Sequence, residues 1–306
     1  MILLWGLLED STFESVYSCL KRRGADVAFV NHAAIGRCRV QMDCGSDTRY
    51  RLSCDDLEYD LGAISAAYLR PYNHRHYEAQ RDPDGGATTV SRADLVHYLM
   101  GIWAENSEAR IVNRRSAEAT NHSKLDQARA IRASGFLIPD SLVTNNPELA
   151  RDFLSRHGSV VYKSMSSVRS VVRELEASAL DAIDRLGPVF FQRRINGQNI
   201  RVHVIGERTV ACRIRATSVD YRYAAASIEP MALREDVAGR CVALTVRLGL
   251  TLSGIDLIQD GDDYYCLEVN PNPAFSCFEE PPDNAIAQAV AELLMQGAHG
   301  TRGRMA

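Results

Sequence analysis

The sequence lacks several features that would place it in a common class of protein. No run of about 18 or more apolar residues occurs, so a transmembrane helix is not expected. The opening Met1–Leu8 stretch carries no basic leader and soon meets Glu9-Asp10, so a signal peptide is not expected and residues 2–8 fit a buried strand. Lys and Arg total 35 against 39 Asp and Glu, a net charge of −4. That balance gives no broad cationic field for nucleic acid, and we expect neither nucleic acid nor a membrane as partner.

Cysteine patterning is equally uninformative about metal binding. Eight cysteines occur, but none form a Cys-x-x-Cys pair. Cys212, Cys241 and Cys266 lie within apolar runs, which is typical of buried thiols. We therefore expect reduced, partly buried cysteines in a cytoplasmic protein.

What the chain does have is enough length for more than one core. Its 306 residues are 46% hydrophobic, which suits two or three subdomains. The hydrophobic periodicity predicts a mixture of strands and helices along the whole length, and so a mixed α/β and α+β fold. The expected strands are residues 2–8, 27–31, 38–43, 48–54, 63–69, 141–144, 159–163, 189–194, 200–205 and 209–216, and the expected helices are residues 13–23, 93–104, 123–134, 147–157, 237–248 and 284–295.

The most informative segment is a predicted hairpin near the C-terminus. Leu252–Gln259 and Asp263–Val269 are β-prone, and Asp260-Gly261-Asp262 between them is typical of a turn. A three-residue loop of Gly261, Asp262 and Asp263 would place Asp256 directly opposite Glu268.

Asn270 shares a face with Glu268, because the two are separated by one residue on the same strand. With Asp256 opposite, three hard oxygen ligands would converge, a set that suits Mg²⁺ held partly through substrate phosphates. The alternative is two exposed acids on an ordinary hairpin. The Asn-Pro-Asn-Pro run that starts at Asn270 argues against it, because strands avoid Asn and Pro unless a bend is needed.

These residues resemble the C-terminal metal motif of ATP-grasp ligases, especially the RimK-like branch, and the likeness covers about residues 110–280. It implies an ATP-grasp fold with an N-terminal α/β pre-ATP-grasp domain at 1–112. A central subdomain at 113–187 and a C-terminal subdomain at 188–306 would follow. It also implies ATP as cofactor, with Mg²⁺ or Mn²⁺ bound by the acidic hairpin, namely by Asp256, Glu268 and Asn270.

Two lysines stand where this family places cations on nucleotide phosphates. Lys163 ends the strand Val160-Val161-Tyr162-Lys163, and Lys124 begins the helix before Ile138-Pro139. A lysine ammonium is a compact point charge suited to phosphate. A solvated helix lysine is the alternative for Lys124. Many relatives carry a glycine-rich phosphate loop after the position of Lys163, whereas residues 164–170 here read SMSSVRS, so serine hydroxyls, backbone N–H groups and Arg169 would have to hold the phosphates.

The run Phe190–Ile195 resembles the strand that leads into the adenine hinge of the family. The resemblance implies nucleotide contacts from Gln192, Arg193, Arg194 and Ile195, with the backbone of the last two reading the base edge. It further implies a ribose contact from Asn199, which replaces the usual acid, and a phosphate or acyl-phosphate contact from Arg201. For Arg201 a structural salt bridge is the alternative.

Further arginines are candidate catalytic residues. Alternation places Arg213 and Arg215 on one strand face, where they could point at a common anion. Arg222 lies in Val219–Arg222, which resembles an Asp-x-Arg element of the ATP-grasp peptide maturases that make graspetides. With Arg201, the residues Arg213 and Arg222 complete the expected catalytic set. Arg70, Tyr72, Arg75 and residues 81–89 are candidate substrate contacts.

The resemblance implies an ATP-dependent ligase that joins a carboxylate to an amine or alcohol through an acyl phosphate and releases ADP. Its partners would be a small-molecule or peptide carboxylate and an amine or hydroxyl acceptor, in a monomer or a homo-oligomer. One alternative is a ribosomal-peptide maturase that forms side-chain ester or amide links. Another is a nucleotide-binding scaffold without catalysis, which the missing glycine loop and Asn199 favour.

Overall fold

The computed structural model describes most of the chain. The described residues are 1–43, 49–55, 57–71, 92–119, 124–164, 172–176, 178–180, 187–216, 226–279 and 284–297. They form two compact units, one of Met1–Glu118 with Leu250–Leu252 and Asn272 onward, the other of Ala119–Gly249 with Ser253–Pro271. These units group residues differently from the expected ranges 1–112, 113–187 and 188–306, and that three-part division stays a prediction.

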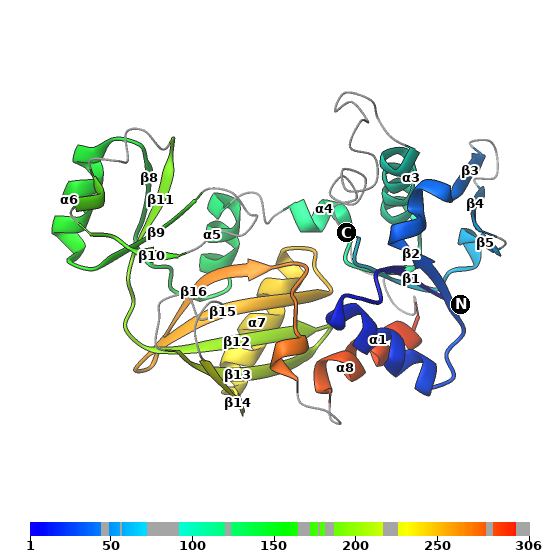
Figure 1. Cartoon of the computed structure of the whole chain (residues 1–306). Coiled ribbons are helices and arrows are strands. Elements are labelled where there is room, and N and C mark those ends of the chain that lie inside the picture. The colour runs from blue at the N-terminus through cyan, green and yellow to red at the C-terminus, as the bar shows by residue number, and fades with distance from the viewer. Residues whose placement is uncertain are drawn as a thin grey trace. The chain divides into compact units, whose positions relative to one another are not determined.

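The first unit is built on a parallel four-stranded sheet of order β2-β1-β6-β7. Helices α1 and α8 lie on one face of this sheet and α3 lies on the other (Figure 1). The elements of this unit are β1 (Ile2–Gly6), α1 (Ser11–Arg22), β2 (Val27–Asn31), β3 (Arg39–Asp43), β4 (Arg49–Cys54), β5 (Leu57–Asp60), β6 (Ala66–Leu69), α3 (Arg92–Asn106), β7 (Arg110–Val112), α4 (Arg115–Glu118) and α8 (Ala285–Met295), with short 3₁₀ turns at His32–Arg37, Leu61–Ala63 and Ser276–Phe278.

Strand alternation explains the two-sided burial of this sheet. Leu3 and Trp5 of β1 point to the α3 side and join a core with Met100 and Trp103. Gly6 points to the opposite side, where the ring of Phe13 from α1 lies so close that a Cβ on Gly6 would meet it at 2.5 Å. A parallel sheet covered on both faces needs strands that are apolar throughout, and β1 is buried at all five positions.

A small antiparallel sheet of order β3-β4-β5 completes the first unit and corrects one expectation. Cys38 and Cys54 form a disulfide with a Cα–Cα distance of 4.3 Å, so these two thiols are not reduced. The β3–β4 ladder pairs Arg39 with Ser53, which puts the next pair outward, Cys38 and Cys54, directly opposite each other. Free thiols remain at Cys19, Cys212, Cys241 and Cys266, which are buried, and at Cys277, which is exposed, whereas Cys44 lies outside the described residues.

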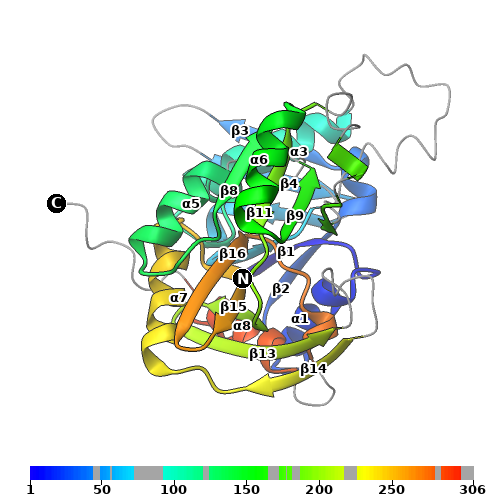
Figure 2. The same ribbon diagram turned by 90° about the vertical axis from the view of Figure 1, so that its left-hand side faces the viewer.

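The second unit contains two antiparallel sheets. The first has the order β10-β9-β11-β8 and is covered by α6 (Figure 2). Its elements are β8 (Ser141–Thr144), α6 (Pro147–His157), β9 (Val160–Ser164), β10 (Arg173–Glu174) and β11 (Val189–Arg193). Asn146 caps α6 by accepting hydrogen bonds from the N–H groups of Glu148 and Leu149, and Pro147 occupies the first turn. The predicted helix therefore begins where its cap predicts.

The second sheet has five strands in the order β14-β13-β12-β15-β16. Helix α7 lies across this sheet (Figure 1), and the Thr245 hydroxyl is 2.7 Å from the Ser253 hydroxyl of β15. The elements are α5 (Lys124–Ala133), β12 (Gln198–Ile205), β13 (Arg208–Ala216), β14 (Ala226–Met231), α7 (Glu235–Arg247), β15 (Leu252–Asp260) and β16 (Asp263–Asn270). In β15, Asp256 has the opposite parity to Ser253, so it faces away from α7.

The β15–β16 hairpin confirms the expected pairing by a different route. Asp256 lies opposite Glu268, as predicted, but the loop has two residues, because Asp260 already pairs with Asp263. A β-bulge restores the register: Asp256 pairs with Glu268 while Leu257 pairs with Cys266, so Leu267 is the extra residue. The predicted pairing of Asp256 with Glu268 is therefore confirmed, whereas the predicted three-residue loop was wrong.

No helix in the described part of the chain is both long and apolar enough to cross a membrane.

Candidate active site

Helix α5 and strand β16 are fixed side by side by one glutamine. The Gln127 side chain donates to the Val269 carbonyl at 2.7 Å and accepts from the Val269 N–H at 2.9 Å, so it takes the place of a strand on the edge of β16. Lys124 is three residues before Gln127 and therefore lies on the same helix face. Its Nζ reaches 3.9 Å from Oε2 of Glu268, the residue next to Val269.

A second lysine reaches the same carboxylate from the other sheet of this unit. Lys163 of β9 donates from Nζ to Oε2 of Glu268 at 3.2 Å. The β9–β11 ladder pairs Lys163 with Phe190, and the two lysine ammoniums lie 5.3 Å (Lys163) and 5.9 Å (Lys124) from the centre of the Phe190 ring. Two cations beside one acid leave an excess of positive charge, which favours an anionic ligand.

The opposing acid of the hairpin has a cation of its own. Arg201 of β12 donates from Nη1 to Oδ1 of Asp256 at 2.8 Å, and the arginine is 5% exposed. Its Nε lies 3.4 Å from Nε2 of His203, which shares the strand face because it is two residues further along. The chain of contacts therefore runs from His203 through Arg201 to Asp256.

The protonation states follow from burial and from these neighbours. Burial raises the pKa of Asp256, and the approach of Glu268 raises it further, while Arg201 opposes both. Burial also opposes ionisation of Glu268, but Lys163 and Lys124 outweigh it and lower the pKa of that carboxyl. Burial and the neighbouring Arg201 hold the pKa of His203 well below its usual range, so His203 is neutral and can accept from Arg201.

The donor set fits the expected cofactors. Asp256 and Glu268 face each other across the hairpin, and the register that pairs Asn270 with Gly254 puts Asn270 on the same face. Two carboxylates and an amide oxygen are hard ligands of the kind that Mg²⁺ uses together with phosphate oxygens. The described residues hold no group of three or more His, Cys, Asp or Glu side chains that would form a metal site without a substrate. Asp256, Glu268 and Asn270 would hold the ion, and Lys124, Lys163 and Arg201 would meet the phosphates.

The expected nucleotide segment on β11 is held mostly by its own contacts. Gln192 is buried and donates to the Ser141 hydroxyl at 3.3 Å. The Arg193 side chain lies 3.5 Å from Asp140, and that of Arg194 donates to Glu174 at 2.9 Å. The Arg194 N–H donates to the Ser159 carbonyl, so base recognition at Arg194 would fall to its carbonyl. The nucleotide roles of these residues, and of the buried Ile195, stay predictions.

The segment after Ile195 is held against β15 at Gly197. A Cβ at Gly197 would lie 2.2 Å from the Gln259 carbonyl oxygen. Any side chain would therefore clash with the backbone of β15, so this position requires glycine. Asn199, the expected ribose contact, follows on β12 and lies opposite Ile214 of β13. Its role also stays a prediction.

The arginines expected to be catalytic do not all gather here. Arg201 lies opposite Cys212 and Arg213 lies opposite Ile200, so alternation puts Arg213 on the other face of the sheet from Arg201. The side chain of Arg215, on the same face as Arg213, lies 3.3 Å from Glu229. Arg222 lies outside the described residues, as do residues 165–171 after Lys163. The structure brings Arg201 to the acidic hairpin and separates Arg213 from it.

Two residues of this cluster, His203 and Phe190, were not predicted from the sequence. His203 could have been found, because it follows Arg201 by two residues on a predicted strand and must share its face. Phe190 could not, because its place beside both lysines depends on the register of β9 and β11. Arg70, an expected substrate contact, is instead bonded to Asp10 at 2.6 Å and to the Pro273 carbonyl at 3.1 Å, so it anchors Pro273 within the first unit.

The sequence of this chain is similar to those of known ATP-grasp proteins. Residues 144–294 match the model of the RimK-like ATP-grasp domain. The chain carries a RimK-like ATP-grasp domain. A probable alpha-L-glutamate ligase of Xanthomonas euvesicatoria pv. vesicatoria (strain 85-10) is 24% identical over 224 residues, which cover 67% of this chain and 72% of that protein.

Solved structures resemble nearly the whole chain. A RiPP-associated ATP-grasp ligase of Chryseobacterium gregarium, in complex with ADP and a leader and core peptide, superposes with a TM-score of 0.80 at 22% identity and covers 96% of each chain. The ATP-grasp ligase PsnB, complexed with minimal precursor, Mg and ADP, gives a TM-score of 0.79 at 27% identity over 97% of each chain. The family resemblance, the ATP-grasp fold and the class of ATP-dependent ligase are thereby confirmed, and the expected ATP and Mg²⁺ are the cofactors of this family.

Lys124 offers a first test of the expected phosphate contacts. Burial and Lys163 lower the pKa of Lys124, and Glu268 raises it, so a bound anion would relieve the repulsion between the two ammoniums. We expect K124Q to raise KM for ATP about tenfold, the value of one charge-assisted hydrogen bond, with a smaller effect on kcat. The control is R129Q, because Arg129 is an exposed cation on the same helix. Equal KM values in the two variants would contradict a phosphate contact.

Proposed function

We propose that this protein is an ATP-dependent ligase that joins a carboxylate to an amine, by way of an acyl phosphate and with release of ADP. The observation that carries the proposal is the meeting of Asp256 and Glu268 with three cations, of which Lys163 and Arg201 are buried. Mg²⁺-bound ATP would supply the phosphoryl group that activates the carboxylate. A cytoplasmic location, where ATP is available, is part of the proposal.

The residues of the site have separate tasks in this reaction. Lys163 and Lys124 neutralise phosphate charge, and each is held by contacts that leave little freedom for its ammonium. Arg201 is oriented by Asp256 and His203, so its positive charge is already in place and needs no reorganisation when negative charge develops. Asp256, Glu268 and Asn270 would hold the metal. Such a site works by positioning and electrostatics and needs no side-chain nucleophile.

A second candidate is a peptide maturase that forms side-chain ester or amide links. The structural similarity to PsnB supports this candidate. PsnB is a ligase whose structure was solved with its precursor, and the similarity extends over 97% of this chain at 27% identity. The likeness to the glutamate ligase covers 67%. In this variant of the proposal both the carboxylate and its acceptor would belong to one peptide.

The purified chain should release ADP only when Mg²⁺, ATP, a carboxylate and an acceptor are all present. Candidate pairs are small amino acids such as glutamate with amines, and peptides rich in Glu, Asp, Ser, Thr and Lys. Mass spectrometry separates the two candidates: ligation joins two molecules with loss of water, whereas maturation removes water from one peptide without adding mass. Binding of ATP and Mg²⁺ without acceptor-dependent ADP release across these sets would favour a scaffold and contradict both.

A further inference from the structure

The parallel sheet of the first unit reverses its winding direction between two strands. From β1 the chain passes through α1 to β2 on one side, and β6 and β7 are added on the other. Helices α1 and α3 lie on opposite faces (Figure 1). In sheets of this kind ligands bind outside the carboxyl ends of the strands, at the point where the order reverses. Here that point lies between the ends of β1 and β6.

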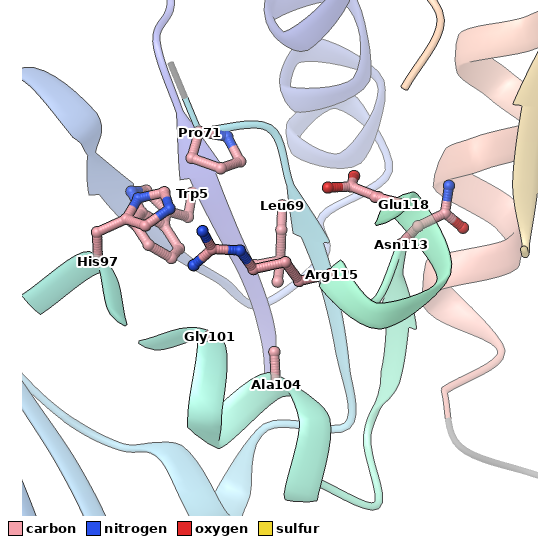
Figure 3. A pocket seen from close by; sticks show the side chains of 9 residues that line it. All are labelled: Trp5, Leu69, Pro71, His97, Gly101, Ala104, Asn113, Arg115 and Glu118. Atoms are coloured by element: carbon pink, nitrogen blue, oxygen red, sulfur yellow. The ribbon is translucent and has the colours of Figure 1, made fainter. Parts of the chain in front are cut away.

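A cavity of about 70 Å³ occupies this position (Figure 3). Trp5 lines it from the end of β1, Leu69 and Pro71 from the end of β6, and Asn113 from the residue after β7. Helix α3 closes another side with His97, Gly101 and Ala104, and α4 contributes Arg115 and Glu118. All of its lining residues belong to the first unit.

One wall of this cavity is aromatic and apolar. The ring centres of Trp5 and His97 are 5.1 Å apart in an edge-to-face arrangement. The Trp5 indole N–H already donates to Nδ1 of His32 at 2.9 Å, so Trp5 offers only its ring to a ligand. Leu69 and Ala104 extend the apolar surface.

The opposite wall carries one charge of each sign. Arg115 and Glu118 are three residues apart on α4, which puts them on one face of the helix. Figure 3 shows the Arg115 guanidinium extending toward Trp5 and His97. A Cβ on Gly101 would lie 3.8 Å from Arg115 Nη1, an ordinary van der Waals distance, so the guanidinium lies beside this turn of α3. Within the described ranges neither the guanidinium nor the Glu118 carboxyl makes a hydrogen bond or ion pair.

We propose that this cavity binds a small free α-amino acid, with its carboxylate on Arg115, its ammonium on Glu118 and its Cα against Trp5 and His97. A guanidinium pairs with a carboxylate through two parallel hydrogen bonds, and an ionised carboxylate accepts a charge-assisted hydrogen bond from an ammonium. Only a ligand with both groups on neighbouring atoms satisfies both charges in so small a cavity. The site goes beyond the proposed ligase function, since the cluster around Glu268 is not needed to form it.

The ionisation of Glu118 supports this assignment. Burial raises the pKa of Glu118 to about 7, against the opposing effects of Arg115 on α4 and Arg70 at the end of β6, with Glu105 of α3 raising it slightly. His97 of α3 also lines the cavity. An ammonium ligand would favour the ionised carboxylate and lower that pKa. Binding at pH 7 should therefore release about half a proton per site.

Isothermal titration calorimetry of the full chain, without nucleotide or magnesium, tests the site with glycine as the probe. We expect glycine to bind, and acetate and methylammonium each to bind at least tenfold more weakly. The heat of glycine binding should depend on the ionisation enthalpy of the buffer. E118Q should weaken glycine binding at least tenfold and remove the buffer dependence, and R115Q should weaken it similarly.

The matched control is E9Q, an exposed acid of the same unit, which should bind glycine as the native chain does. Thermal unfolding of each variant shows whether it is folded, and R115Q keeps the test available if E118Q is not, because Arg115 is exposed. Glycine binding that E118Q and R115Q leave unchanged would overturn the proposal, as would acetate binding as tight as that of glycine. Because no ATP is present, neither result depends on the ligase activity.

Discussion

E268A is expected to abolish ADP formation. The substitution removes a proposed metal ligand and leaves Lys163 and Lys124 without the acid that both of them contact. Metal-ion stabilisation of transition-state charge is worth several kcal/mol, so we expect kcat/KM to fall by at least about a thousandfold. A coupled assay of ADP release at saturating Mg²⁺ measures the loss.

D263A provides the control on the same hairpin, because Asp263 is exposed and pairs only with Asp260 across the turn. That variant should keep native turnover. E268Q preserves shape and one oxygen ligand, so it should regain part of the activity when Mg²⁺ is raised. Native turnover in E268A would refute the metal assignment outright, whereas equal losses in E268A and D263A would point to damage to the hairpin.

The hairpin also shows what the sequence could and could not predict. Alternation and turn residues were sufficient to place Asp256 opposite Glu268, because both acids belong to short β-prone runs with a clear turn between them. They were not sufficient to give the loop length. A two-residue loop with a bulge at Leu267 and a three-residue loop without one produce the same pairing, and periodicity does not distinguish them.

Local signals located many elements of the fold. The strand Val27–Asn31 and the strand Ser141–Thr144 have the predicted bounds, because each is a β-branched or aromatic run with clear breakers at its ends. Strand β14 was missed. It contains Pro230 and lies at the edge of its sheet, where pairing with β13 rather than its own propensity defines it.

Contacts between distant residues could not be predicted in the same way. Gln127 acting as a strand on β16, and Arg201 on Asp256, depend on how elements far apart in sequence come together. The Cys38–Cys54 disulfide also depends on a register that the sequence does not give. A two-residue turn at Gly45-Ser46 would put Cys38 opposite Ser53, whereas the observed ladder pairs Ser53 with Arg39 and so brings Cys54 opposite Cys38.

R201L is expected to affect stability as well as activity. Arg201 is 5% exposed and is the cation hydrogen-bonded to Asp256, whose side chain is 19% exposed, so its removal leaves a largely buried carboxylate without that cation. Breaking a buried pair from one side costs about 3–5 kcal/mol of unfolding free energy. The pKa of Asp256 is already raised by burial and should rise further once the opposing charge is gone. Chemical denaturation of the ligand-free chain measures the cost.

The pH dependence has a definite sign. The unpaired Asp256 would bind a proton more tightly in the folded state than in the unfolded state, so the deficit of R201L should shrink as the pH is lowered toward the raised pKa of Asp256. It should be largest at neutral and higher pH, where the unfolded chain holds Asp256 ionised and the folded chain must either bury that charge or take up a proton.

A second substitution separates pairing from catalysis. R201L/D256N removes both charges, so it should recover part of the stability lost in R201L and should lose the pH dependence of the deficit. Turnover should stay undetectable, because a proposed metal ligand and a proposed phosphate contact are both missing. Recovery of stability without turnover would show that each charge offsets the destabilisation that the other would cause alone. It would also show that activity requires these side chains for a separate reason. If R201L were as stable as the native chain at every pH, Arg201 would not be the residue that stabilises the acid on this strand. Its role would then be limited to binding the phosphates.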